Sequence, residues 1–403
     1  MLLRPPCYLA KRPFIKGIVV FIRTLQIVDM DIAIINKRFS PLRSATGFHA
    51  YQLALHLKND GHKVQFITTV PKSTDIPKTE DALTRVWINS SYDGKNIVRR
   101  LLGDFIDALR LVRNAKSTGA DHIIVMSDPP FLQLIASYFL VPANTSFWFM
   151  DIYPQAFVAR GLISIKNPIY KWYLQRLRTF KPKNFLALGT NQAKYIQDQF
   201  GYSNEIWSPI GLQQLNLTGS APRPYWYDGP DLIYLLYKGN LGSAHDAQFI
   251  VALVNQLDST KFRLIVNASG AKAELLIRSI GEKKSVEIVE HLTDHDLAYT
   301  DVHIVTLLDK WTHICVPSKA LLAISAGSAL LYHGSDQSDT WEYIKSASWR
   351  ISDEYDKNSE IVSFLSILTI EEIKKKKTKS VELYQQLADQ LKQSYANYES
   401  KLR

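Results

Sequence analysis

The chain has 403 residues, more than one ordinary hydrophobic core organises, so we expect two domains. Hydrophobic residues make up 46% and charged residues 21% of the sequence, a balance that excludes a disordered or fibrous protein. The formal net charge of +10 favours anionic partners such as acidic lipid, nucleic acid or phosphorylated molecules.

Residues 1–29 mix basic side chains with one short apolar patch, GIVVFI, and lack the small-residue cleavage pattern of a signal peptide. Two interpretations stay open: a poorly ordered or non-native extension, or a basic amphipathic segment that lies on a membrane. The folded part is expected to begin at residue 30, because the next stretch, DIAIINKRF, has the pattern of a core strand.

The N-terminal part of the chain alternates short apolar runs with helical periodicity, which predicts βαβ units and a parallel sheet. The strand DIAIINKRF, the loop SPLRSATG, the helix FHAYQLALHLKNDG and the strand KVQFITT form one right-handed crossover. The most apolar run, FLQLIASYFLV, is about half of the ~20 residues that span a bilayer, so it is predicted to be a buried helix. Residues 30–208 are therefore assigned to an N-terminal Rossmann-like domain.

A linker without periodicity, rich in Pro, Gly and Ser, occupies residues 208–229. A second set of alternating strands and helices follows it, so residues 209–379 are assigned to a C-terminal Rossmann-like domain. Residues 380–403 are predicted to be a C-terminal helix. In open α/β sheets, ligands bind at the carboxyl ends of the strands, so loops at these positions are the candidate sites.

The stretch YKGNLG places Gly239 and Gly242 between a strand and a helix, where free backbone N–H groups could cradle an anion. The dinucleotide fingerprint G-x-G-x-x-G is absent, so a tight turn without a ligand remains the alternative. The stretch CVPSKALLAISAG places Pro317 and Ser318 where a helix begins, with Ser318 as its expected cap and Lys319 as a charge for a phosphate. A capped core helix would explain the first two residues but would not require the lysine.

Two further candidates follow strands of the first domain. Thr46 and Gly47 open the helix after the first strand, so the start of that helix is predicted to face a phosphate or a sugar. Asp151 ends the very apolar strand in TSFWFMD, where a carboxylate is costly unless it is solvated or paired. It is a candidate for sugar contact or acid–base chemistry, with a structural turn residue as the alternative.

Other sequence patterns give weaker evidence about function. The ten histidines show no metal-ligand spacing, and Cys7 and Cys315 fit neither a metal site nor a disulfide framework, so we expect no metal and a reducing cytoplasmic compartment. The lysine run at 374–377 is interpreted as a solvated helix face, with an anionic membrane surface as the alternative. It has no interleaved aromatic residues, so we expect no nucleic-acid partner.

Five motifs in the same order carry a family resemblance: SATGFHAYQLALHLKNDGHKV, SDPPF, DIYPQAFVARG, YKGNLG and VPSKALLAISAG. Together they resemble the GT-B glycosyltransferases of family 4, in particular the bacterial branch that builds colanic acid, capsule and O-antigen polysaccharides. The resemblance covers residues 31–345. It implies a GT-B fold, in which two Rossmann-like domains with parallel sheets face each other across a cleft, and a last helix that crosses back to the first domain.

The resemblance also implies an activity. The donor is a nucleotide sugar bound on the second domain, the acceptor is lipid-linked or a glycan on the first, and transfer retains the anomeric configuration without a metal or other cofactor. The protein would work in the cytoplasm, in peripheral contact with the inner face of the membrane. Asp151 matches an aspartate near the acceptor and the reacting sugar. The matched donor-binding positions are Thr46, Gly47, Gly239, Asn240, Gly242, Ser318 and Lys319.

The sequence departs from the family at two places. Ser44 and Ala45 stand where paired glycines are usual, and Ile314 and Leu322 stand where many members carry two glutamates, a pair that the polysaccharide branch also commonly lacks. Three alternatives therefore stay open: an inactive partner subunit that binds the donor, a GT-B-fold epimerase acting on UDP-N-acetylglucosamine, and a basic protein that binds nucleic acid or membrane.

Overall fold

The structure is a computed structural model. It describes the residues in the ranges 29–38, 45–70, 83–92, 94, 96–209, 211–215, 217, 222–352 and 356–402. The N-terminal extension, apart from residue 29, and the loop that contains Ser44 lie outside these ranges.

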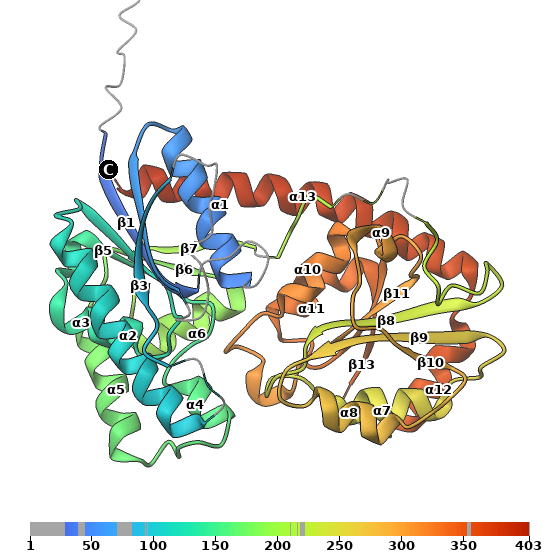
Figure 1. The fold of residues 1–403 in the computed structure, drawn as a ribbon. Helices are drawn as coiled ribbons and strands as arrows, with labels where there is room; N and C mark the ends of the chain where they lie inside the picture. Colours follow the sequence, from blue (N-terminus) through green and yellow to red (C-terminus); the bar gives the residue numbers. More distant parts are fainter. Residues whose placement is uncertain are drawn as a thin grey trace, which may run out of the picture.

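The first sheet is built from seven parallel strands in the order β3-β2-β1-β4-β5-β6-β7 (Figure 1). Its central strands are buried along almost their whole length, which explains their continuous apolar runs. The strands are β1 (Asp31–Arg38), β2 (Lys63–Val70), β3 (Thr84–Asn89), β4 (His122–Val125), β5 (Thr145–Trp148), β6 (Asn184–Ala187) and β7 (Glu205–Trp207).

Helices cover both faces of this sheet. The core on one face includes side chains of α1, and the core on the other includes side chains of α2, α3, α5 and α6. The edge strand β3 and the long helix α2 were not predicted from the sequence. The helices are α1 (Ala45–Asn59), α2 (Ile97–Ser117), α3 (Leu132–Phe139), α4 (Gln155–Ala159), α5 (Pro168–Thr179) and α6 (Thr190–Phe200).

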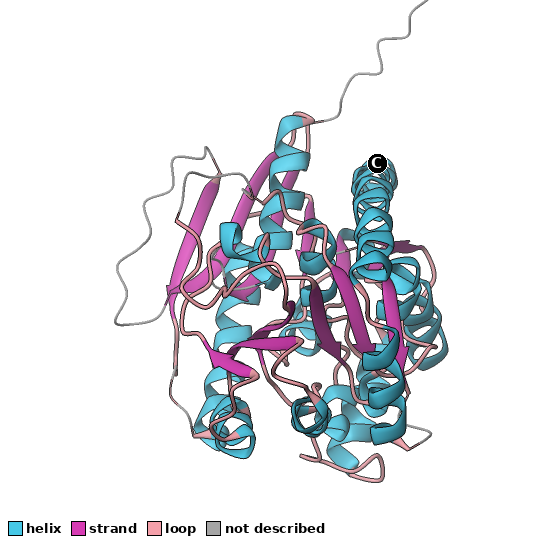
Figure 2. Cartoon of the chain, turned by 90° about the vertical axis from the view of Figure 1, so that its right-hand side faces the viewer, coloured by secondary structure: helices cyan, strands magenta, loops and turns pink. Residues whose placement is uncertain are grey.

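The second sheet has six parallel strands in the order β10-β9-β8-β11-β12-β13, with helices on both sides (Figure 2). The strands are β8 (Ile233–Asn240), β9 (Phe262–Ser269), β10 (Val286–Ile288), β11 (Val302–Thr306), β12 (Ala329–His333) and β13 (Ser348–Ile351). The helices are α7 (Ala247–Gln256), α8 (Ala273–Ile280), α9 (Asp294–Leu297), α10 (Ser318–Ser325), α11 (Asp339–Ile344), α12 (Lys357–Ile367) and α13 (Ile370–Leu402). Both sheets share the doubly wound strand order, which confirms the predicted pair of Rossmann-like α/β domains.

The last helix joins the two domains. The helix predicted at 380–403 is the second half of α13, which runs from the second domain to the first (Figure 1). Near its start Lys377 pairs with Asp301 at 2.9 Å, and further along the Ser394 hydroxyl donates to the Trp207 carbonyl at 2.7 Å. Its final turn packs Tyr398 into the core beneath the first sheet. One continuous helix therefore contributes to the cores of both domains.

A second joint is made by Asp339, which begins α11 of the second domain and caps α6 of the first. Its carboxylate accepts the backbone N–H groups of Asn191 and Gln192 at 2.9 and 2.7 Å. A Cβ atom on Gly189 would overlap this carboxylate, so a glycine there allows the close approach. The Asp339 side chain thus satisfies two N–H groups that a helix N-terminus leaves without an intrahelical partner.

We expect Asp339→Ala to lower the free energy of unfolding by about 1 to 2 kcal/mol, because it strips α6 of its cap in a buried joint. Urea denaturation of the full chain measures the effect. Asp336→Ala is the matched control, since Asp336 lies three residues away, is exposed and pairs at the surface with Arg350. Equal stability of the two variants would contradict the capping role.

Candidate functional site

Lys319 lies in the first turn of α10 and reaches back over the end of β8. Its Nζ donates to the Tyr237 hydroxyl at 2.9 Å and to the Asn240 carbonyl at 3.3 Å, and it lies 4.5 Å from the centre of the Tyr237 ring. Burial lowers the pKa of Lys319 to about 7. The ammonium group has no carboxylate partner among the ion pairs of the described residues, so its charge remains available to an anionic ligand.

The start of α10 differs from the prediction in one respect. Pro317, not Ser318, is the N-cap, and no side chain caps the helix. Ser318 is the first helical residue, because the backbone of Pro317 is still extended, with φ −60° and ψ 112°. The first N–H groups of α10 therefore stay without a side-chain acceptor next to Lys319, which is the arrangement that binds phosphate groups.

The glycine stretch after β8 also differs from the prediction. Gly239 and Asn240 are the last residues of β8, and the N-terminus of α7 is not free, because Asp246 caps it through the N–H groups of Gln248 and Phe249. Asp246 is held in turn by Lys357. The anion cradle expected at α7 is therefore filled by the chain's own carboxylate.

The glycines at the end of β8 still have a clear role. Gly239 has a φ of +117°, and a Cβ atom built on it would meet only the Lys319 side chain, at 3.9 Å. No side chain therefore covers the backbone of Gly239 beside the Lys319 ammonium group. Gly242 lies two residues after Asn240, and its carbonyl accepts a turn hydrogen bond from the His245 N–H at 3.2 Å. These positions form the wall of the site next to Lys319.

Two further cationic or titratable groups border this wall and were missed in the sequence. Lys272, in the turn before α8, donates to the His245 carbonyl at 2.9 Å. His245 contacts the Thr306 carbonyl through Nδ1 at 2.6 Å, and burial together with the charge of Lys319 lowers its pKa to about 3. Lys272 follows a different strand, so only the pairing of β8 with β9 brings it here.

Asp151 lies beyond the carboxyl end of β5, at the contact between the domains. It forms an isolated antiparallel bridge with Cys315, three residues before α10. Its backbone N–H donates to the Ser127 hydroxyl at 3.1 Å, which fixes the turn. Burial raises the pKa of the Asp151 carboxyl, the charge of Arg160 opposes this, and that of Asp128 adds to it.

The surroundings of Asp151 are charged. Arg160 follows α4 and lies over the ring of Trp311 from the second domain, 5.8 Å from its centre. Asp128 lies three residues beyond the end of β4, and burial raises its pKa against the charge of Arg38. Residues from the segments after β4 and β5 and from the second domain therefore converge at one place.

A buried ion-pair cluster supports this edge of the first sheet. Lys37, near the end of β1, pairs with Asp104 at 2.7 Å and with Asp107 at 2.8 Å, both on α2. Burial lowers the pKa of Lys37, but its two carboxylate partners outweigh this and raise it. The three charges anchor α2 to β1, and no pattern in the sequence pointed to them.

Thr46 and Gly47 lie in the first turn of α1, as predicted. The Asn36 side chain of β1 donates to the Thr46 hydroxyl at 3.4 Å. The turn lies at the same carboxyl edge as Asp151, because β1 neighbours β4 and β4 neighbours β5. The structure thus brings Asp151 into contact with the segment before Lys319, and it places Thr46 and Gly47 at the same edge two strands away.

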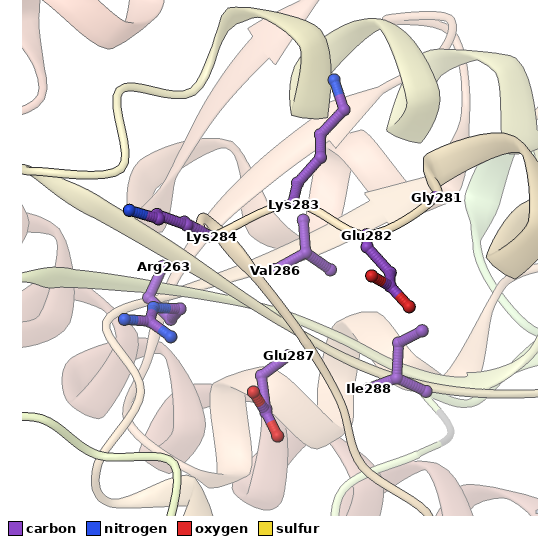
Figure 3. A pocket seen from close by; sticks show the side chains of 8 residues that line it. All are labelled: Arg263, Gly281, Glu282, Lys283, Lys284, Val286, Glu287 and Ile288. Carbon is purple, nitrogen blue, oxygen red and sulfur yellow. The ribbon is translucent and has the colours of Figure 1, made fainter.

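Two other features lie apart from this site. A shallow pocket beside β10 is lined by Arg263, Lys283, Lys284 and two glutamates, so its charges are mixed and do not single out an anion (Figure 3). Within the described ranges, His56, Asp60 and Glu399 hold donor atoms within 4.8 Å of one another, where α13 meets the end of α1. This group lies at the edge opposite to the carboxyl ends of the strands, so it does not belong to the site around Lys319. The expectation of a metal-free reaction stays a prediction.

Comparison with known proteins identifies the architecture. No family model and no curated protein matches the chain. Sucrose-phosphate synthase from Thermosynechococcus elongatus is 13% identical over 91% of this chain and 98% of its own, with a TM-score of 0.67. WaaG, a glycosyltransferase involved in lipopolysaccharide biosynthesis, is 15% identical over 89% and 94%, with a TM-score of 0.58. A glycosyltransferase from Rickettsia africae is 13% identical over 93% and 99%, with a TM-score of 0.61.

These similarities show the fold of the chain, which is the two-domain GT-B architecture expected from the motifs. The chain also covers nearly the whole length of the structures it resembles. Among the described helices, none is both long and apolar enough to cross a membrane.

Proposed function

We propose that the protein is a glycosyltransferase that moves a sugar from a nucleoside diphosphate sugar to a lipid-linked or polysaccharide acceptor with retention of configuration. The observation that carries the proposal is the bridge between Asp151 and Cys315. It brings a half-buried carboxylate of the first domain next to the segment that leads into Ser318 and Lys319 of the second. A donor bound at Lys319 would therefore present its sugar toward Asp151.

The residues around Lys319 can stabilise the charge of a diphosphate that leaves the donor sugar. As the bond to the sugar breaks, negative charge develops on the phosphate oxygens, and fixed positive groups stabilise that charge. Lys319 and the uncapped N-terminus of α10 offer such groups, and Lys272 adds a third beside the same wall. Because these groups are cationic or polar donors, the chemistry proposed here does not require a metal ion.

The acceptor side supplies a carboxylate in a protected position. Asp151 can accept a hydrogen bond from a sugar hydroxyl and can stabilise positive charge on the ring in the transition state. The diphosphate itself would take the proton of the attacking hydroxyl as it leaves, which keeps the reaction on one face of the sugar. Retention follows from that course, and the resemblance to family 4 favours it.

Donor binding should depend on pH through Lys319. Its pKa of about 7 means that much of it is neutral above pH 7 in the free protein, whereas a bound diphosphate requires the cation. We expect the dissociation constant of a nucleoside diphosphate to rise about 20-fold between pH 7.5 and 9, where the terminal phosphate is already ionised. Titration calorimetry measures this. Lys319→Arg should flatten the profile, because a guanidinium stays charged, and an equally steep profile in that variant would contradict the assignment.

The identity of the donor is tested by thermal stability of the full chain against a panel of nucleoside diphosphates and nucleotide sugars, because a ligand of the native state raises the unfolding temperature. A shift with one nucleotide identifies the donor base for transfer assays. Binding without transfer to any lipid or glycan acceptor would indicate an inactive partner subunit. Conversion of UDP-N-acetylglucosamine to its epimer without an acceptor would indicate the epimerase.

A further inference from the structure

The first domain carries apolar and basic side chains on the outer side of three neighbouring helices. In Figure 1, α2, α3 and α5 lie on the same side of the first sheet, and their inward side chains share one core. Ring contacts join them: Phe105 of α2 lies 5.8 Å from Phe131 at the start of α3, and Tyr138 of α3 stacks on Trp172 of α5 at 6.3 Å. We call the outward side of these helices and their adjoining turns the α2–α3–α5 surface.

This surface gathers the exposed large apolar side chains of the first domain. In the described part of the chain, 11 of the 18 exposed large hydrophobic residues belong to it, and the other seven are scattered over the second domain and α13. Val98 and Leu102 are 72% and 62% exposed, and Trp172 is 50% exposed. The members are Ile97, Val98, Leu102, Phe105, Tyr138, Phe139, Val141, Leu162, Ile165, Ile169 and Trp172. Single exposed apolar residues are ordinary, but a cluster of this size indicates an interaction site.

The exposed charges on the three helices of this surface have one sign. The acidic residues of α2 are Asp104 and Asp107, and both are buried against Lys37. In the fully described helices α2, α3 and α5, the charged side chains that reach the surface are therefore all basic. They are Arg99, Arg100, Arg110, Arg113, Lys116, Lys171, Arg176 and Arg178. The guanidinium of Arg176 lies 4.2 Å from the centre of the Tyr138 ring.

We propose that the α2–α3–α5 surface docks the protein onto an anionic lipid bilayer. Basic side chains attract the acidic headgroups, and aromatic and aliphatic side chains enter the interface between headgroups and acyl chains. Tyr138, Trp172 and Arg176 combine both properties in one stack. The proposal rests on the proposed function, since a bilayer would bring a lipid-linked acceptor to the carboxyl edge at which α2 begins.

The lysine run is a weaker candidate for this role. Lys375 pairs with Glu372 at 2.8 Å, Lys377 pairs with Asp301 at 2.9 Å, and Lys376 lies over the Trp349 ring. The charges of Lys375 and Lys377 are thus already paired with carboxylates of the protein. The surface of α2, α3 and α5 differs because its acidic residues are turned inward.

Binding of the full-length protein to vesicles tests the proposal. We expect it to bind vesicles of 30% phosphatidylglycerol in phosphatidylethanolamine at least tenfold more tightly than phosphatidylcholine vesicles, and less tightly at 0.5 M than at 0.1 M NaCl. Arg99→Glu/Arg100→Glu should weaken binding by at least twentyfold, because each basic residue near the surface contributes about fivefold. Lys283→Glu/Lys284→Glu, on the second domain (Figure 3), is the matched control and should bind as the wild type does.

The apolar contribution is tested separately. Val98→Ser/Leu102→Ser should weaken binding at least tenfold, whereas Leu275→Ser/Val362→Ser, which alters exposed residues of the second domain, should not. Acyl chains carrying bromine should quench part of the tryptophan fluorescence, and Trp172→Phe should bind normally but lose that quenching. Wild-type binding by both the Arg99/Arg100 and Val98/Leu102 variants, or equal binding to neutral vesicles, would overturn the proposal.

Vesicle binding requires no catalysis, so the two hypotheses fail separately. If the protein binds vesicles as described but transfers no sugar, the docking surface is supported and the proposed function is contradicted. If the protein transfers sugar to a water-soluble acceptor but does not bind anionic vesicles, the proposed function is supported and the docking surface is contradicted.

Discussion

Lys319→Ala is expected to weaken binding of the donor nucleoside diphosphate about 30- to 150-fold and to lower kcat/KM for sugar transfer by about 10²- to 10³-fold. A hydrogen bond to a charged group contributes about 2 to 3 kcal/mol, and groups that stabilise developing charge contribute more in the transition state. The effect is large because Lys319 lies beside the bare backbone of Gly239 and the uncapped start of α10. Titration calorimetry and a coupled assay for diphosphate release measure the two losses.

Lys284→Ala is the control for this experiment, since Lys284 is an exposed lysine at the far edge of the second sheet (Figure 3). It removes the same charge from the protein and should leave both constants unchanged. Lys319→Ala should also fold normally, because the side chain contributes no ion pair to the core. If the alanine variant bound the nucleotide as tightly as the wild type, the donor site would have to be placed elsewhere.

Asp151→Asn is expected to reduce sugar transfer by about 10²- to 10³-fold while leaving nucleotide affinity nearly unchanged, because in the proposed complex the carboxylate would face the reacting sugar and not the diphosphate. Asparagine keeps the shape of the side chain and removes the charge. The contrast with Lys319→Ala is diagnostic, since one variant loses binding and turnover and the other loses turnover alone.

The same substitution should change stability in a predictable direction. The pKa of Asp151 is raised in the folded state, so the free energy of unfolding falls as the pH rises from the ordinary carboxyl pKa to the raised one, and the loss is complete above the raised pKa. Asp151→Asn should therefore be at least as stable as the wild type at pH 8, and the difference should shrink as the pH is lowered toward 4. Asp198→Asn, an exposed position on α6, is the control. A variant that is less stable than the wild type and transfers sugar normally would show that Asp151 is a structural turn residue.

Much of the fold could be predicted because the buried strands are nearly continuous apolar runs with polar residues at their carboxyl ends. This pattern is visible in the strands that contain Ile34, Phe147 and Leu236. It was not recognised for α2, whose inward face begins with Gly103, Asp104 and Asp107 and becomes apolar only from Ala108 onward. In this first half the buried positions hold an ion-pair cluster, while Val98 and Leu102 are exposed, so the usual pattern of a buried helix is reversed there.

The candidate site could be predicted only in part, for a similar reason. Lys319 and Asp151 belong to local motifs, and they lie on segments that touch in the structure, although their roles stay predictions. Lys272 comes from the turn after another strand, and only the register of β8 with β9 places it there. Asp339 caps α6 through a contact made in the tertiary structure, which no local pattern reveals, whereas Asp246 is a local N-cap of α7 that was overlooked in the sequence.

The most direct test of the proposed function is a transfer assay with the nucleotide sugar that the stability panel identifies, with a lipid-linked acceptor in anionic vesicles. The product would be isolated and the configuration of the new glycosidic bond read by NMR. We predict transfer with the anomeric configuration of the donor, lost in both Lys319→Ala and Asp151→Asn. An inverted product, or undiminished transfer by either variant, would contradict the account.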